Sequence, residues 1–199
     1  MSGGVSGDGS QVGRAGLRTV AGAPTVWFTG LSGAGKTTIA RAVAGLLADA
    51  GVAHTLLDGD ELRATLSADL GFSREDRAEQ VRRVGHLARI LGDAGVIPLV
   101  ALVSPFRADR DAVRTLHDPG RFVEVHVATA LEVCAQRDVK GLYARSAARS
   151  AAGEDDLLTG VRQEYEAPER PELMLDGGGG VGVEALARRV WERLGVGRA

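Results

Sequence analysis

The sequence predicts an α/β protein, a parallel sheet of five strands with helices on both faces. Three observations lead to this fold class. Segments with the apolar pattern of strands alternate along the chain with segments of helical pattern. Residues 97–103 form a nearly unbroken apolar run, which is typical of a central parallel strand buried on both faces. A glycine-rich segment, residues 30–37, joins the first strand-like run to the first helix-like run.

Length and composition exclude several classes of protein. The chain has 199 residues, enough for one domain with a proper core, and its net charge of -2 gives no reason to expect nucleic acid as a partner. No apolar run approaches the ~20 residues that span a bilayer, so we expect no membrane association. Cys134 is the only cysteine, which excludes an internal disulfide and suits the cytoplasm; we expect it to be a small buried side chain. Residues 1–23 are rich in Gly and Ser, and we expect a disordered leader before a domain that spans residues 24–199.

The glycine-rich segment fits G-x-x-x-x-G-K-[ST], the pattern of a phosphate-binding P-loop. Residues 25–29 before it are β-branched and aromatic, as in a buried strand, and residues 39–50 after it have apolar side chains at helical spacing. Backbone N–H groups and the helix N-terminus then face a triphosphate. We expect Lys36 to neutralise the β- and γ-phosphates and Thr37 to bind Mg²⁺. The residues expected to contact the nucleotide are Gly30, Ser32, Gly33, Ala34, Gly35, Lys36, Thr37 and Thr38.

The alternative to a phosphate site is a glycine-rich turn that happens to hold a lysine. Lys36 and Lys140 are the only lysines, and every other basic residue apart from histidine is an arginine. A composition that avoids lysine, yet has one at the motif position, argues against coincidence. A compact ammonium also reaches between phosphates where a planar guanidinium would not fit.

A second strand is predicted at residues 53–57, and it ends in Asp58-Gly59-Asp60. Acidic residues at the carboxyl end of a parallel strand lie at the edge where ligands bind. The alternative is that one of them caps the next helix. Asp60 is the better candidate for the cap, since residues 61–63 resemble a helix start, and Asp58 then remains available for chemistry.

The later part of the chain continues the alternation of strands and helices. The expected elements are a helix at 75–94, a strand at 97–103, a helix at 107–117, a strand at 122–127, a helix at 130–137, a strand at 173–176 and a helix at 183–194. Residues 138–165 are the least regular stretch, and their length predicts a mobile lid. No N-K-x-D follows a strand, which argues against a switch GTPase, and the best apolar strand ends in Ser104 rather than the Asp of a large ATPase. A small phosphotransferase with a three-layer P-loop kinase fold remains.

Several strings in this layout resemble the adenylylsulfate kinase (APS kinase) family. They are Asp58-Gly59-Asp60 with Arg63, residues 69–73, residues 82–85, residues 104–110, residues 140–143 and residues 165–169. The resemblance covers about residues 25–194. It implies transfer of the γ-phosphate of ATP, with Mg²⁺, to the 3′-hydroxyl of adenosine 5′-phosphosulfate (APS), which gives PAPS. The family often forms dimers, so a homodimer is an expected assembly.

The resemblance also implies roles for individual residues. Asp58 would orient or deprotonate the 3′-hydroxyl. Ser104 matches the serine described in the family as a phosphoserine intermediate. The alternative role for Ser104 is a hydroxyl that binds Mg²⁺ or substrate. Arg137 would lie near the ATP adenine. The residues expected at the acceptor are Asp58, Arg63 and Arg77 for the phosphosulfate, Phe72 stacked on the adenine, the backbone of Val103 and Ser104, and Gln80, Lys140 and Leu142.

Four positions depart from the family pattern at the acceptor. Gln80 stands for the usual Asn, Val139 for Pro, and Asp156 and Leu158 for a basic residue and a Phe in the lid. Two kinase hypotheses therefore stand: an APS kinase with a divergent lid, and a relative whose acceptor is another hydroxylated anion or nucleotide. A nucleotide-binding regulatory subunit without turnover is a third, against which the intact P-loop argues.

Overall fold

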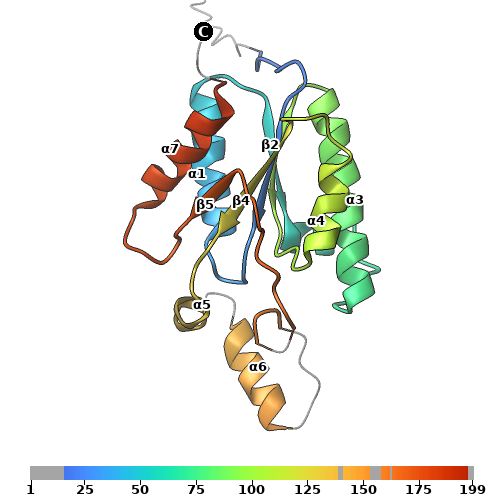
Figure 1. Ribbon diagram of the computed structural model, residues 1–199, viewed down its shortest axis with the longest axis vertical. Helices are drawn as coiled ribbons and strands as arrows, with labels where there is room; N and C mark the ends of the chain where they lie inside the picture. Colours follow the sequence, from blue (N-terminus) through green and yellow to red (C-terminus); the bar gives the residue numbers. More distant parts are fainter. Residues whose placement is uncertain (1–15, 139–140, 153–157, 162, 197–199) are drawn as a thin grey trace, which may run out of the picture.

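The computed structural model describes residues 16–138, 141–152, 158–161 and 163–196. Its strands form one sheet in the order β2-β3-β1-β4-β5, and every neighbouring pair is parallel (Figure 1). The strands are β1 (Thr25–Thr29), β2 (His54–Asp58), β3 (Ile97–Ala101), β4 (Phe122–Val127) and β5 (Leu173–Leu175). The predicted parallel five-stranded sheet is confirmed.

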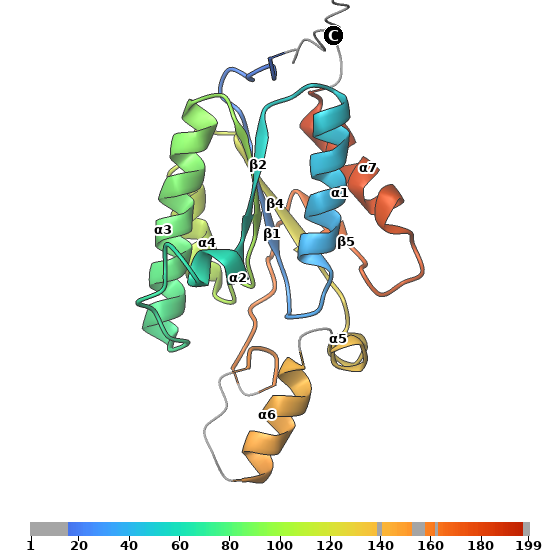
Figure 2. The ribbon, with the colours of Figure 1, turned by 180° about the vertical axis from the view of Figure 1, so that it is seen from behind.

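Helices cover both faces of this sheet, as predicted. Helices α1 and α7 lie on one face and α3 and α4 on the other, as the two opposite views show (Figures 1 and 2). The helices are α1 (Lys36–Asp49), α2 (Gly59–Arg63), α3 (Arg74–Asp93), α4 (Arg107–Arg114), α5 (Leu131–Arg137), α6 (Leu142–Ala151) and α7 (Val183–Leu194). Helices α5 and α6 lie beyond the carboxyl ends of the strands, where the P-loop also lies (Figure 1).

The central strand β1 contributes to a hydrophobic core on each face of the sheet. Val26 and Phe28 pack in the core beneath α1 and α7, while Trp27 belongs to the core beneath α3. All three side chains are fully buried. Side chains alternate between the faces of a strand, so the two cores hold the carboxyl end of β1 from both sides. The P-loop begins at that rigid end.

Several element boundaries differ from those predicted, and one helix was not predicted at all. Strand β3 ends at Ala101, two residues early, because the chain turns at Ser104, whose φ of 39° lies outside the strand region. Helix α1 begins at Lys36, inside the P-loop motif. The lid segment is not irregular throughout, since it contains helix α6. Of the predicted lid, residues 139–140, 153–157 and 162 lie outside the described residues.

Part of the segment expected to be a disordered leader belongs to the fold. Arg18 forms a parallel bridge with Val52, and the N–H of Val20 donates to the carbonyl of Gly95 at 2.9 Å. Ala23 is buried. The folded part therefore includes residues 18–23, and the rest of the expected leader, residues 1–15, lies outside the described residues. None of the described helices combines the length and apolarity needed to cross a membrane.

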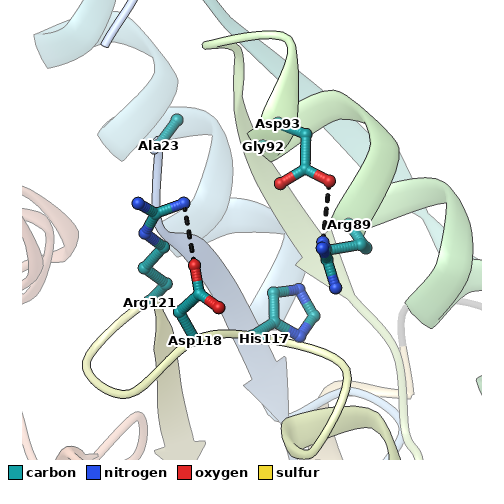
Figure 3. A pocket seen from close by; sticks show the side chains of 7 residues that line it. All are labelled: Ala23, Arg89, Gly92, Asp93, His117, Asp118 and Arg121. Carbon is teal, nitrogen blue, oxygen red and sulfur yellow. Dashed lines mark hydrogen bonds and ion pairs between the residues drawn. The ribbon is translucent and has the colours of Figure 1, made fainter. Parts of the chain in front are cut away.

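A small hollow lies at the opposite end of the sheet from the P-loop. It is bounded by Ala23, just before β1, by Arg121, just before β4, and by the end of α3 (Figure 3). Two ion pairs line it, Arg89 with Asp93 and Arg121 with Asp118. Its cavity volume is about 10 Å³, far less than the roughly 300–1,000 Å³ of most ligand pockets. Its charges are already paired, so we assign it no ligand.

His117 lies beside this hollow (Figure 3). Its Nδ1 lies 3.0 Å from the carbonyl oxygen of Val113, which can only accept, so Nδ1 carries the proton of the neutral ring. Its Nε2 accepts from the hydroxyl of Thr25 at 2.9 Å. Burial lowers the pKa of His117, and the hydrogen bond with Val113 partly opposes this. The folded protein therefore favours the neutral ring.

We expect the free energy of unfolding to decrease as pH falls below about 6.5, the pKa of an unfolded histidine. Unfolded His117 takes up a proton there that the folded protein resists, so the unfolded state gains stability. His126, whose pKa burial also lowers, adds to the effect. His117→Gln lacks this pH-dependent contribution to stability. The difference between the urea midpoints of wild type and variant should therefore become smaller as pH is lowered from about 7.5 to about 5.5. An equal difference at both pH values would contradict the prediction.

Candidate active site

The P-loop lies between the end of β1 and the start of α1. Gly30 has a φ of 147°, and a Cβ there would lie 2.5 Å from the carbonyl oxygen of Val127, so only glycine fits between the strands. The N-cap of α1 is Gly35, and the first turn of this helix carries no acidic residue. No acidic side chain of the helix's own first turn therefore competes for the N–H groups at its start, which favours an anion there.

Lys36 lies across the mouth of the P-loop. Its ammonium donates to the carbonyls of Gly30 at 2.9 Å and Leu31 at 2.7 Å, and the residue is 8% exposed. The positive charge is thus held at the entrance to the N–H groups of the loop. Of the other predicted contacts, Ala34 is fully buried and can contribute only backbone, and Thr38 is exposed.

Thr37 and Asp58 bring two hard oxygen ligands together. The Thr37 hydroxyl donates to Asp58 Oδ2 at 2.6 Å. Within the described ranges, no group of three or more His, Cys, Asp or Glu side chains could hold a metal ion. Mg²⁺ typically takes one or two protein oxygens and completes its shell with phosphates and water, so this pair fits it.

The cap of α2 is Asp58, not Asp60 as predicted. Asp58 Oδ1 accepts from the backbone N–H of Asp60 at 2.9 Å, while Asp58 itself keeps an extended backbone. The carboxylate is 7% exposed and bonds to the helix start through one oxygen and to Thr37 through the other. A cap and a catalytic carboxylate are compatible, because an ionised carboxylate offers about four acceptor sites over its two oxygens.

Arg63, Phe72 and Arg77 form a second cluster next to α2. The guanidinium of Arg63 lies 4.4 Å from the centre of the Phe72 ring, and that of Arg77 lies 5.5 Å from it. The Nε of Arg77 donates to the Phe72 carbonyl at 3.1 Å. Phe72 is 54% exposed, so its ring is available to a ligand. The amide of Gln80 donates to the carbonyl of Gly59 at 3.2 Å and so ties α3 to the start of α2.

Burial and mutual repulsion affect the charges of Arg63 and Arg77. Burial and then the neighbouring Arg63 lower the pKa of Arg77 to about 10. Burial likewise lowers the pKa of Arg63, and Asp76 and Asp60 partly offset this. Two guanidinium groups that repel each other beside an exposed aromatic ring would be stabilised by an anion attached to a flat base.

Ser104 is buried between side chains of β1. Its Oγ accepts from the indole N–H of Trp27 at 3.0 Å and donates to the Thr29 hydroxyl at 3.1 Å, and the residue is 3% exposed. A phosphate on this oxygen would replace the proton donated to Thr29 and would have to fit at a buried position, so the geometry favours a structural role for the side chain over the catalytic one expected. The carbonyl of Val103 accepts from Thr29 at 2.7 Å.

The described part of the lid contacts both the P-loop and the cluster of Arg63, Phe72 and Arg77. Tyr143 on α6 donates from its hydroxyl to the carbonyl of Ser32 in the P-loop at 2.8 Å. A Cβ on Gly160 would lie 2.7 Å from Leu31, so this glycine packs directly on the P-loop. The amide of Gln163 donates to the Phe72 carbonyl at 3.4 Å. The lid thus spans the distance between the phosphate site and the arginine cluster.

The remaining predicted site residues lie at the edges of this arrangement. Arg137 donates to the carbonyl of Gly177 at 2.8 Å, and a Cβ on Gly177 would lie 2.6 Å from the Ala34 carbonyl oxygen, which places this pair against the back of the P-loop. Leu142 begins α6 and is half-buried. Lys140, Val139 and Asp156 lie outside the described residues.

Comparison with known proteins identifies the family. The model of the adenylylsulphate kinase family matches residues 22–176. The chain belongs to the adenylylsulphate kinase family. It is 51% identical over 169 residues to an adenylyl-sulfate kinase of Vibrio vulnificus, an alignment that covers 85% of this chain and 79% of the relative.

Solved structures of the adenylylsulphate kinase family share the fold. The APS kinase CysC of Mycobacterium tuberculosis, solved in complex with AMPPNP and APS, is 42% identical, with a TM-score of 0.80 over 88% of this chain and 99% of that one. A hexameric APS kinase from Thiobacillus denitrificans is 34% identical, with a TM-score of 0.64 over 88% of this chain and 29% of that one.

Sequence reasoning missed one group of residues next to this family's site. Tyr165, after the lid, lies with its hydroxyl 3.0 Å from that of Thr29. Burial raises the pKa of Tyr165 to about 12, so the hydroxyl stays protonated. Arg110 and Glu166 lie beside it. Residues 165–169 and 104–110 stood out as strings typical of the family, but no pattern within either string indicated that they touch.

Proposed function

We propose that this chain phosphorylates the 3′-hydroxyl of APS with ATP, releasing ADP and PAPS. It uses the P-loop with Thr37 and Asp58 for ATP, and the cluster of Arg63, Phe72 and Arg77 for APS. Membership of the adenylylsulphate kinase family carries the activity, with ATP and Mg²⁺. One observation carries the residue roles. Helix α2 has only five residues, with the carboxylate that touches Thr37 at its start and Arg63 over Phe72 at its end. A helix of this length spans about 7–8 Å, so the phosphate donor and the acceptor meet at Asp58.

The donor half neutralises charge. Phosphoryl transfer needs in-line positioning and charge stabilisation more than covalent help. The N–H groups of the P-loop and the Lys36 ammonium bind the β- and γ-phosphates. When bound, Mg²⁺ neutralises further charge on these phosphates, and Thr37 and Asp58 are the residues that would hold it. Asp58 orients the acceptor hydroxyl and takes up its proton as the oxygen–phosphorus bond forms.

The acceptor half holds an anionic nucleotide. Arg63 and Arg77 bind the phosphosulfate, where charge-assisted hydrogen bonds give both energy and orientation. The exposed ring of Phe72 stacks on the adenine. Gln80, the backbone of Val103 and Ser104, and the lid with Lys140 and Leu142 complete the proposed acceptor site.

An assay of ATP consumption tests the activity. We expect ATP use to depend on APS and to yield a product phosphorylated at the 3′ position, while other adenosine phosphates and hydroxylated anions are used far less well. ATP consumption that follows another acceptor would instead favour the second kinase hypothesis. Binding of ATP without consumption, with any acceptor, would favour the regulatory subunit.

Replacing Arg77 with methionine tests the acceptor half. We expect KM for APS to rise about 10- to 100-fold, because charge-assisted hydrogen bonds to the phosphosulfate are lost, while KM for ATP stays nearly constant. Arg82→Met is the control, since Arg82 is a more exposed arginine of the same helix that pairs with Glu79. Equal increases in both KM values for Arg77→Met would argue against a role at the acceptor.

Leu158→Phe tests the divergent lid. Leu158 is half-buried and stands where the family has a phenylalanine. We expect the variant to bind APS about three- to tenfold more tightly, since an aromatic ring adds a stacking surface for adenine. Calorimetric titration with APS measures the affinity. Unchanged or weaker binding would indicate that position 158 does not face the acceptor base.

Assembly and location remain part of the proposal. We propose a homodimer, since multisubunit relatives such as the hexameric enzyme exist, and light scattering of the purified protein measures the state. A cytoplasmic location is supported by the single cysteine of the chain.

A further inference from the structure

The guanidinium of Arg110 joins two chain segments that border the proposed acceptor site. Arg110 lies on α4 and is 1% exposed. One terminal nitrogen donates to the carbonyl of Ser104 at 2.7 Å, and the other donates to the carbonyl of Glu166 at 2.7 Å. The first carbonyl belongs to the loop after β3, and the second lies just after the lid. These two segments are 62 residues apart in the sequence.

A buried carboxylate holds this guanidinium in place. The Nε of Arg110 donates to Glu124 Oε1 at 2.7 Å, and Glu124, on β4, is 5% exposed. The other oxygen of Glu124 accepts from Arg114 at 3.0 Å, and Arg114 also pairs with Glu172 at 2.5 Å. Each nitrogen of the Arg110 guanidinium thus has a partner, and its orientation follows from strand β4 beneath it.

The loop that Arg110 holds is strained. Ser104 has a φ of 39°, a conformation that costs energy in any residue with a side chain and persists only where its surroundings impose it. The hydrogen bond from Arg110 to the Ser104 carbonyl is one such constraint, and the buried Ser104 hydroxyl is another. The backbone of this loop is the part that the proposed site offers to the acceptor.

The segment after the lid is fastened at the same place. The Tyr165 hydroxyl lies 3.0 Å from that of Thr29, and Thr29 in turn donates to the Val103 carbonyl at 2.7 Å. The guanidinium of Arg110 lies 5.8 Å from the centre of the Tyr165 ring. Three parts of the chain therefore meet at Arg110. They are the end of β1, the loop after β3, and residues 165–166, which we call the root of the lid.

We infer that Arg110 is a positioning residue for the acceptor, through which the root of the lid and the loop after β3 keep a fixed relative position. It touches neither substrate. The inference rests on the proposed function, since it concerns the acceptor half of that site. Three nitrogens in a planar fork reach a carboxylate and two carbonyls at once, whereas the single ammonium of a lysine cannot keep all three contacts at these positions.

Kinetics of Arg110→Lys test this inference. We expect KM for APS to rise about tenfold, the size typical for the loss of a charge-assisted hydrogen bond, with KM for ATP nearly unchanged. Arg114→Lys is the matched control, because Arg114 binds the same Glu124 but, in the described structure, neither of the two carbonyls. It is expected to lower Tm while leaving the ratio of the two KM values unchanged.

Tyr165→Phe decides the matter if Arg110→Lys does not fold. It removes only the hydroxyl that lies against Thr29, and we expect a smaller rise in KM, again confined to APS. Equal changes in both KM values, or none, in the folded variants would overturn the inference, as would the same rise in KM for APS in Arg114→Lys. Failure of the proposed function is a separate result, because the wild type would then show no ATP consumption dependent on APS.

Discussion

Lys36→Ala is expected to lower kcat by about 10²–10³-fold or more, the cost of removing a single preorganised charge from a developing anion. The ammonium lies at the mouth of the P-loop, within 2.9 Å of the Gly30 carbonyl. Without it, the γ-phosphate loses its point charge both in the ground state and during transfer. The rate of ATP consumption dependent on APS measures the loss, and titration with an ATP analogue measures how much of it is binding.

Arg41→Ala is the matched control for this variant. Arg41 lies on α1 as well, and it is exposed. We expect its kcat to remain close to wild type, and circular dichroism should show that both variants are folded. Near-normal turnover in Lys36→Ala would contradict the assignment of the P-loop as the phosphate site.

Asp58→Asn should reduce kcat by about 10²–10⁴-fold, the usual contribution of a general base, with a much smaller loss of ATP affinity, because Thr37 and the phosphates would still hold Mg²⁺. Asparagine has nearly the same shape, and its side-chain oxygen can still accept the N–H of Asp60, so the cap of α2 is preserved. The variant removes the negative charge that orients and deprotonates the acceptor hydroxyl. Steady-state kinetics with saturating ATP and APS measure the effect.

Two further variants separate the roles of this carboxylate. Asp58→Ala also removes the cap and should cost about 0.5–2 kcal/mol of stability in addition. Glu61→Gln, at an exposed acidic residue in the first turn of the same helix, is expected to leave kcat unchanged. A loss of ATP affinity in Asp58→Asn, with kcat preserved, would show that Asp58 acts through the metal alone.

Much of the donor site could be predicted because it is local. Residues 30–37 are contiguous, and their spacing alone determines a loop whose N–H groups face one point. The choice between Asp58 and Asp60 as the cap was not predictable. It depends on a shift of two residues in the helix start, which the backbone conformation of Asp58 decides.

Helix α6 was not predicted from the sequence, for a different reason. Its ten residues are rich in Ala, Arg and Ser, and they carry few large apolar side chains to mark a buried face. In the structure, the Tyr143 hydroxyl bonds to the P-loop, and the Asp138 carboxylate accepts from the backbone N–H groups of Tyr143 at 3.0 Å and Ala144 at 2.9 Å.

The sequence by itself determined the fold class and the phosphate loop and, through family resemblance, predicted the residues of the proposed acceptor site, because each depends on neighbours in the chain or on short strings. The tertiary structure alone decided which distant segments meet. Arg110 lies 14 residues from Glu124 and 56 from Glu166, yet it bonds to both at 2.7 Å. Contacts of this kind arise from the packing of α4 against the sheet, which leaves no periodic trace in the sequence.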